Sequence, residues 1–480
     1  MHLIDLGIFV GYMVAMLGVG YYFMNQNKSQ DDYYVGGRSI GSWHIGLSVV
    51  ATDVGGGFSV GLGGLGFVMG LSGSWMLFTG LLGAWLAAVF LIPRVKSDKA
   101  FANFYTFPQI FQHLFDKKVG IVAAIISMVG YLGFTSSQLL AGAKLASGTF
   151  LELSLTQALV IMGVIAVVYT VLGGLKAVIY TDTVQWIILM LGFIFIGLPV
   201  AYYHVGGWES IRATLPDEYF SLTNLRWQDL ANWGITILPI WFIGMTLYQR
   251  IFASRDEKSA KKAWFIAGLF EWPIMAFMGV GLGLLSKVAF EQGLLIIDLD
   301  TLDPEMGLPI LLRTILPPGI LGLMMAAYFS AVLSTADSCL MAASGNLSTD
   351  IFGKWLNAKP EKYQIRFSQL FTLILGILAL AVSMQMTNVL ELMLYSYAFM
   401  VSGLLVPILF GLFTEKRSPW AAVAAMISGG TVTATLGAME LNLPLGLDPN
   451  FFGLFTSLAM YLLVYYISDK KKQNKNKVYA

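Results

Sequence analysis

The feature that most constrains this chain is a series of apolar windows, each about 20 residues long and free of Asp, Glu, Lys and Arg, that recurs from end to end. About 20 apolar residues are needed to cross the hydrocarbon core of a bilayer as a helix. Because 57% of the 480 residues are hydrophobic and only 12% are charged, no stretch remains for a soluble domain. The sequence predicts an all-α integral membrane protein.

We predict about thirteen transmembrane helices in one transporter domain, 1–480. Their expected ranges are 3–24, 41–70, 72–94, 119–149, 154–175, 177–203, 229–250, 262–287, 318–350, 366–385, 388–414, 418–438 and 450–468. Basic residues accumulate on the cytoplasmic side of membranes. With the N-terminus outside and the basic tail 469–480 in the cytoplasm, every Lys and Arg lies on the cytoplasmic side except Lys144, Arg212, Arg226, Lys287 and Arg313. We therefore expect a multi-pass protein of the plasma (inner) membrane, surrounded by lipid, with no nucleic-acid partner.

Two of the predicted spans, five spans apart, carry residues that interrupt helices. The second contains Gly55-Gly56-Gly57, and the seventh contains Pro239 and Gly244. Glycine weakens a helix, and proline removes a backbone hydrogen bond. Paired broken helices are typical of transporters built from inverted repeats, which here span 41–203 and 229–414. The alternative is that the glycines only permit close helix packing.

Ionisable side chains at membrane depth are functional candidates, because burying a charge there is costly. Asp53 lies beside the three glycines, where unwinding exposes carbonyl oxygens next to a carboxylate and favours contact with a cation or amine; the alternative is an N-cap. Asp182 is expected either to reach Ser338 or to form a salt bridge with Arg250 or Lys176. The remaining members of this group are Glu271, which receives no role, Lys144, which is expected to snorkel to the interface, and Asp337.

In the ninth span, Ala331, Ser334, Thr335 and Ser338 follow the i, i+3, i+4, i+7 spacing of one helical face, and Asp337 borders that face. Oxygen ligands suit hard cations, so the stretch is a candidate sodium site. The alternative is that the hydroxyls bond the carbonyl four residues earlier. The four histidines lack metal-site spacing, and neither a phosphate-binding loop nor a nucleophile elbow occurs. Secondary transport is therefore favoured over an enzyme.

Three motifs carry a family resemblance: Asp31-Asp-Tyr-Tyr-Val-Gly-Gly-Arg-Ser39, Tyr169-Thr-Val-Leu-Gly-Gly-Leu-Lys-Ala177 and Gln249-Arg250. Over residues 1–468 the chain resembles the sodium/solute symporter family of proline, choline, pantothenate and sugar symporters. The resemblance implies a LeuT-type five-plus-five inverted repeat with an extra N-terminal helix and two C-terminal helices, and Na⁺ as the coupling ion.

The resemblance also implies the ligands of sodium. The first site would use backbone oxygens of Ala51, Val54 and Ala331 with the hydroxyls of Ser334 and Thr335. A second site would use Asp182, Ser334, Asp337 and Ser338, although Asp337 stands where the family often has a hydroxyl.

The solute pocket is expected at mid-depth, on the helices around the breaks. Its predicted members are Asp53, Phe58, Tyr131, Phe134, Gln138, Trp241, Phe242 and Tyr395. A carboxylate among aromatic rings suits a small amine or zwitterion, so an amino acid such as proline, or a related amine, is the expected solute. A sugar or carboxylate symporter and a transporter-like membrane sensor are the alternatives, and the oligomeric state is not predicted.

Overall fold

The computed structural model describes residues 2–24, 29–150, 153–295, 303–439 and 441–478. Within these ranges the chain forms helices and no strand, apart from one isolated bridge between Ile40 and Ser254. Ten helical segments of the described chain are long and apolar enough to cross a membrane, and Leu3–Val19 and Leu155–Val171 are shorter apolar helices. The all-α membrane class is confirmed, whereas the count of thirteen spans stays a prediction.

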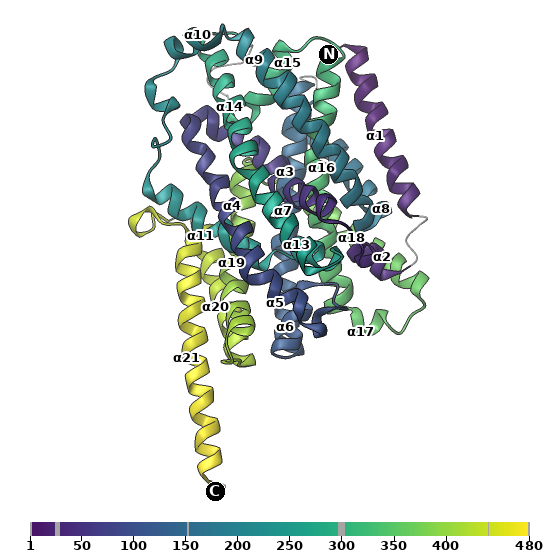
Figure 1. The fold of residues 1–480 in the computed structure, drawn as a ribbon, viewed down its shortest axis with the longest axis vertical. Helices are drawn as coiled ribbons and strands as arrows, with labels where there is room; N and C mark the ends of the chain where they lie inside the picture. Colours follow the sequence, from purple (N-terminus) through teal and green to yellow (C-terminus); the bar gives the residue numbers. More distant parts are fainter. Residues whose placement is uncertain (1, 25–28, 151–152, 296–302, 440, 479–480) are drawn as a thin grey trace.

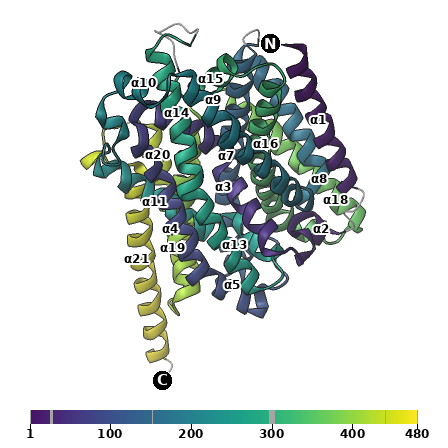
Figure 2. The same cartoon turned by 45° about the horizontal axis from the view of Figure 1, so that its top comes forward.

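The long helices run side by side in one bundle, with the two termini at opposite ends (Figures 1 and 2). We call the end that carries the N-terminus, α10 (Gly207–Thr214) and α15 (Gly307–Ile315) the N-terminal face. The opposite end, with α5 (Ile92–Ser97), α6 (Phe107–Leu114) and α17 (Gly353–Leu356), is the C-terminal face. The last helix, α21 (Pro449–Val478), projects beyond the bundle there, and its side chains from residue 469 onward lie outside the described residues.

The remaining helices form the body of the bundle and its connections. They are α1 (Leu3–Met24), α2 (Gln30–Val35), α3 (Ser42–Met69), α4 (Trp75–Leu86), α7 (Lys117–Thr149), α8 (Leu155–Gly192), α9 (Leu198–His204), α11 (Trp227–Ile243), α12 (Met245–Ala253), α13 (Glu257–Leu269), α14 (Ala276–Glu291), α16 (Ile320–Gly345), α18 (Glu361–Ser383), α19 (Val389–Phe413) and α20 (Pro419–Ala438).

Both predicted helix breaks are present. In α3, Gly55 has φ 37° and ψ −168°, a backbone conformation essentially restricted to glycine. Between α11 and α12, Gly244 is extended with φ −65° and ψ 114°, while Pro239 stays inside α11. A third break, which the sequence analysis did not predict, lies at Trp272 (φ −137°, ψ 125°) between α13 and α14. Each of these breaks frees backbone groups from the helical hydrogen-bond pattern inside the bundle.

Close backbone approaches fix the path of α3 and α4. A Cβ on Gly46 would lie 3.0 Å from the Ala263 carbonyl oxygen, and one on Gly66 would lie 2.2 Å from that of Val280, so α3 runs parallel to α13 and α14. α4 runs antiparallel to the same helices. Its later residue Trp85 contacts the earlier Phe265, whereas its first residue Trp75 stacks on the later Trp272. The chain therefore reverses between α3 and α4, as the separate ranges 41–70 and 72–94 predicted.

A second reversal lies within α8. The hydroxyls of Tyr169 and Thr181 are 3.0 Å apart, whereas twelve residues of a straight helix rise about 18 Å. The chain must therefore turn back between these two residues, which agrees with the two separate spans expected at 154–175 and 177–203.

The N-terminal helix is joined to α16 by polar contacts. The buried Asp5 carboxylate accepts hydrogen bonds from the backbone N–H groups of Gly319 and Gly322 at 2.7 and 2.9 Å. These groups begin α16 and would otherwise lack partners. Further along the same two helices, the Ser330 hydroxyl donates a hydrogen bond to the Tyr12 hydroxyl. α1 is thus attached to the helix that contains the predicted sodium ligands.

Candidate functional site

The break in α3 packs directly against α16. A Cβ at Gly55 would lie 2.0 Å from Oγ1 of Thr335, so only glycine allows this approach. The Thr335 hydroxyl oxygen is 3.0 Å from the carbonyl oxygen of Ala51 and 3.3 Å from that of Ala331. Three of the five predicted ligands of the first sodium site therefore converge. Carbonyl and hydroxyl oxygens at a helix break are suited to a hard monovalent cation.

The other two predicted ligands of this site are less closely defined. Ser334 is buried, and its hydroxyl faces the Asp182 carboxyl group without a hydrogen bond of normal geometry. The side chain of Val54 lies outside the described residues. Ser334 thus borders the converging oxygens on one side and the predicted second site on the other.

The predicted second site is occupied by an arginine. Nη2 of the fully buried Arg250 lies 2.6 Å from Ser338 Oγ, 2.7 Å from Thr52 Oγ1 and 3.4 Å from Asp182 Oδ2. Of the two alternatives for Asp182, the structure contains the salt bridge with Arg250. Asp337 does not join this group, because its Oδ1 accepts a hydrogen bond from Thr170 at 2.5 Å.

Asp53 is buried two residues before the Gly55 break. Its Oδ1 is 3.5 Å from the Tyr397 hydroxyl, and its carboxyl group interacts directly with that of Glu271. Glu271 is also fully buried, and its Oε2 lies against Gly80, where a Cβ would approach to 2.2 Å. Two carboxyl groups thus meet at the centre of the bundle. A shared proton or a bound cation relieves the repulsion between such groups.

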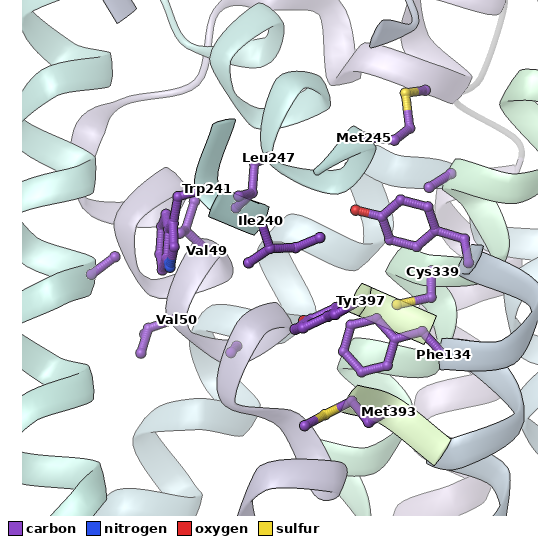
Figure 3. Packing of buried hydrophobic residues seen from close by; sticks show 14 of the residues in the cluster. Val49, Val50, Phe134, Ile240, Trp241, Met245, Leu247, Cys339, Met393 and Tyr397 are labelled. Carbon is purple, nitrogen blue, oxygen red and sulfur yellow. The ribbon is translucent and has the colours of Figure 1, made fainter. Parts of the chain in front are cut away.

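Aromatic rings from α7 and α19 lie near Asp53, and Figure 3 shows two of them, Phe134 and Tyr397, beside each other. The rings of Phe134 and Tyr397 meet edge to face at 4.8 Å, and Tyr131 is 6.5 Å from Phe134. The Tyr131 hydroxyl accepts a hydrogen bond from the Thr246 N–H at 3.2 Å, at the first turn after the Gly244 break. The structure therefore brings Asp53, Tyr131 and Phe134 together, with Tyr397 as a partner that the sequence analysis missed.

Gln138 and Trp241, two other residues of the predicted pocket, are dispersed. Gln138 is buried one turn after Phe134 on α7, with Nε2 3.3 Å from Ser137 Oγ. Trp241 packs edge to face on Trp264 and lies apart from Phe134 and Tyr397 in Figure 3, with Ile240 between them.

Two further members of the predicted pocket, Phe242 and Tyr395, have other surroundings in the described structure. Phe242 is partly buried, and its carbonyl oxygen accepts a hydrogen bond from the Tyr248 hydroxyl at 2.9 Å. The side chain of Tyr395 is 41% exposed and faces the N-terminal face. The side chain of Phe58 lies outside the described residues.

A cavity of about 420 Å³ opens toward the N-terminal face, where its α3 lining begins at Gly61. It lies between α3, α11 and α19, and its acidic lining residues are Asp303, Glu305, Glu391 and Asp448. Burial, with a smaller contribution from the nearby Asp229 carboxylate, raises the pKa of Asp448 above its ordinary value. The negative lining favours the approach of cations over that of anions.

Lys144 lies beside this cavity in an ion pair. Its Nζ is 2.5 Å from Asp303 and 2.6 Å from Glu305, and its side chain is 2% exposed. Glu305 also accepts hydrogen bonds from the backbone N–H groups of Val389 and Leu390 at 3.0 Å. The prediction that Lys144 snorkels was wrong, because acidic partners from a distant loop hold it inside the protein.

These features can be compared with known proteins. A sequence model of the sodium:solute symporter family matches residues 33–429. The chain belongs to this family. The predicted family is therefore confirmed, and sodium is the coupling ion.

Curated relatives match along most of their length. The osmoregulated proline transporter OpuE of Bacillus subtilis (strain 168) is 28% identical over 445 residues, covering 89% of this chain and 87% of the relative. A sodium/proline symporter of Staphylococcus aureus (strain NCTC 8325 / PS 47) is 26% identical over 480 residues, covering 96% and 91%.

Solved structures agree on the fold. A Na⁺-coupled sialic acid symporter, in a substrate-bound outward-open state, superimposes with a TM-score of 0.79 at 21% identity, over 97% of this chain and 98% of that one. A nucleobase-cation-symport-1 family transporter gives 0.57 at 13% identity, over 92% and 94%. The inverted-repeat transporter fold expected from the sequence is confirmed.

Proposed function

We propose that this sodium-coupled symporter imports proline or a closely related small zwitterion. The observation that carries the proposal is the position of the Asp53 carboxyl group, beside the Phe134 and Tyr397 rings and two residues before the break that forms the candidate sodium site. A carboxyl group suits an ammonium, and aromatic rings pack against an apolar ring while tolerating its positive charge. Relatives named as proline transporters support the same solute.

Coupling between sodium and solute would arise because the sodium ion connects two helices. A sodium ion held by oxygens of Ala51, Val54, Ala331, Ser334 and Thr335 would bridge the α3 break and α16. We propose that 41–203 and 229–414 are the two repeats, and that this bridge stabilises the state that accepts solute. An ion drives a conformational change only through its different affinity for the two states. Sodium would thus raise solute affinity, and solute would raise sodium affinity to the same extent.

We also propose that the N-terminal face is extracellular and that the C-terminal tail is cytoplasmic. Two observations support this orientation: the distribution of Lys and Arg along the chain, and the acidic cavity that opens at the N-terminal face. In this orientation, entering sodium gains about 2.3 kcal/mol for each 100 mV of inside-negative potential.

The test is uptake into proteoliposomes under an inward sodium gradient. Radiolabelled proline should accumulate, and excess unlabelled sugars or carboxylates should not compete. Asp53→Asn should raise the solute KM strongly, while Ser334→Ala and Thr335→Ala should raise the sodium concentration for half-maximal uptake. Failure of proline to move in any sodium gradient, or movement of a sugar or carboxylate instead, would refute the proposed solute. Proline binding without flux would indicate a sensor.

A further inference from the structure

A hollow of about 510 Å³ lies on the C-terminal face. It is formed by the first residue of α7, by α17 and by the residues on either side of α17. Three of its lining residues are lysines, Lys117, Lys354 and Lys359, and two are aromatic, Phe352 and Trp355. These five side chains are exposed, and none of the described residues that line the hollow is acidic. The hollow is therefore both basic and aromatic.

The aromatic side chains of the hollow pack against α18. The Phe352 ring stacks on that of Phe371 with 5.2 Å between the ring centres, and the Trp355 ring meets that of Phe367 edge to face at 4.7 Å. α18 is apolar enough to span a membrane, yet only 28% of its apolar window is buried against the rest of the chain. Its exposed apolar side chains include Leu370, Leu373, Ile374, Ile377 and Leu378. Because Ile374 and Leu378 follow Phe371 at i+3 and i+7, an apolar stripe runs along α18 from the hollow into the membrane.

The positive charge around the hollow exceeds the negative charge. The segments 116–118 and 350–366 carry six Lys and Arg against three Asp and Glu. Two of these acidic side chains are engaged in the fold: Asp116 accepts a hydrogen bond from the Val119 N–H at 2.9 Å and caps α7, and Asp350 accepts one from the Thr106 hydroxyl at 2.7 Å. An anion that enters the hollow would therefore meet positive charge that the protein itself leaves unbalanced.

The position of the hollow favours a lipid over a free anion. Basic pockets at the cytoplasmic end of membrane helices suit anionic lipid headgroups, and tryptophan is favoured at headgroup depth because its ring is amphipathic. Here the Lys359 ammonium nitrogen lies 5.5 Å from the centre of the Trp355 ring. A free phosphate could use only the lysines, whereas a phospholipid can use the lysines, the tryptophan and the apolar stripe of α18 together.

We propose that this hollow binds one anionic phospholipid. Lys117, Lys354 and Lys359 contact its phosphate, its glycerol region packs on Trp355, and its acyl chains lie along the stripe of α18. In the orientation proposed above, the lipid belongs to the inner leaflet. Its binding depends on neither the solute nor the coupling ion. Because Lys117 begins α7 and Phe352 follows the helical continuation of α16, Asn346–Ile351, the lipid connects the ends of two helices and stabilises the folded protein.

The first experiment uses wild-type protein alone, delipidated in a non-ionic detergent. Dioleoylphosphatidylglycerol should raise the unfolding temperature and leave one retained lipid for each protein in native mass spectrometry, whereas dioleoylphosphatidylcholine should do neither. Glycerophosphoglycerol, which is the headgroup without acyl chains, and inorganic phosphate should bind at least about tenfold more weakly, because two buried methylene groups already contribute about that factor. Equal stabilisation by phosphatidylcholine, or by inorganic phosphate at the same concentration, would overturn the proposal.

The second experiment removes the charges of the hollow by the triple substitution Lys117→Gln, Lys354→Gln and Lys359→Gln. Each lysine near an anionic headgroup strengthens binding about fivefold, so the apparent affinity for phosphatidylglycerol should fall about a hundredfold, while the unfolding temperature without lipid stays at the wild-type value because the side chains are exposed.

The matched control removes three exposed lysines that lie outside the hollow, near α5 on the same face: Lys99→Gln, Lys258→Gln and Lys262→Gln. It should keep the wild-type affinity for phosphatidylglycerol. An equal loss of affinity in both triple variants would show diffuse attraction by the whole face, and an unchanged affinity in the hollow variant would show that its lysines do not bind the lipid. Either result contradicts a headgroup site in this hollow.

Discussion

Replacing Gly55 by alanine tests whether the break in α3 is required for sodium binding. The added Cβ would lie 2.0 Å from Thr335 Oγ1 and 2.7 Å from Thr335 Cβ. The backbone conformation of Gly55 costs any other residue about 1–3 kcal/mol, and overpacking adds about 1–3 kcal/mol. The expected loss in the free energy of unfolding is therefore about 2–6 kcal/mol, a large fraction of the 5–15 kcal/mol of a typical protein. Displacement of Thr335 should also weaken sodium binding.

The assay combines thermal unfolding in detergent with the sodium dependence of proline uptake. Gly234→Ala is the matched control, because a Cβ at Gly234 of α11 meets no atom within 4 Å. That variant should be neutral or gain up to about 1 kcal/mol from the better helix propensity of alanine. If Gly55→Ala unfolds at the wild-type temperature and keeps the wild-type apparent sodium affinity, the close contact between the break and α16 does not support the site.

Three further substitutions test other parts of the structure. Lys144→Met removes the partner of two carboxylates and should destabilise the protein by about 3–5 kcal/mol, whereas Lys287→Met, in a more exposed ion pair, should have little effect in the same unfolding assay. Tyr131→Phe removes the hydroxyl that meets the start of α12 and should raise the solute KM; an unchanged KM would exclude that role. Gly283→Ala places a Cβ 2.0 Å from the Gly63 carbonyl oxygen and should cost about 1–3 kcal/mol, so wild-type stability would argue against this packing.

The sequence predicted those parts of the fold that depend on local chemistry. Apolar windows gave the helical class, and the breaks lie at Gly55 and Gly244 because these residues disrupt helices wherever they occur. At Pro239 the same reasoning was too broad, since α11 continues through the proline. The break at Trp272 carried a local signal in Pro273, but a proline alone does not distinguish a kinked helix from a broken one.

The candidate site was harder to predict, because membrane depth can be inferred from a sequence whereas the direction of a side chain cannot. A helix that is apolar on all sides has no hydrophobic face to orient it. The predicted pocket therefore included both Trp241 and Phe134 because both lie at mid-depth, although the two side chains lie apart. Partners distant in sequence were equally hidden: Arg250 meets Ser48 across 202 residues, and Lys144 meets Asp303 across 159. Each residue was recognised as charged, but its partner came only from the fold.

The attachment of α1 to α16 through Asp5 has a consequence for how ligand binding can be followed. α1 contains none of the proposed sodium ligands, yet its Asp5 caps the helix that supplies Ala331, Ser334 and Thr335. Sodium that holds α16 in place should therefore slow amide hydrogen exchange at the start of α16 and in the first turns of α1. A reporter group near the N-terminus would sense occupancy of a site deep in the membrane without altering any residue that forms it.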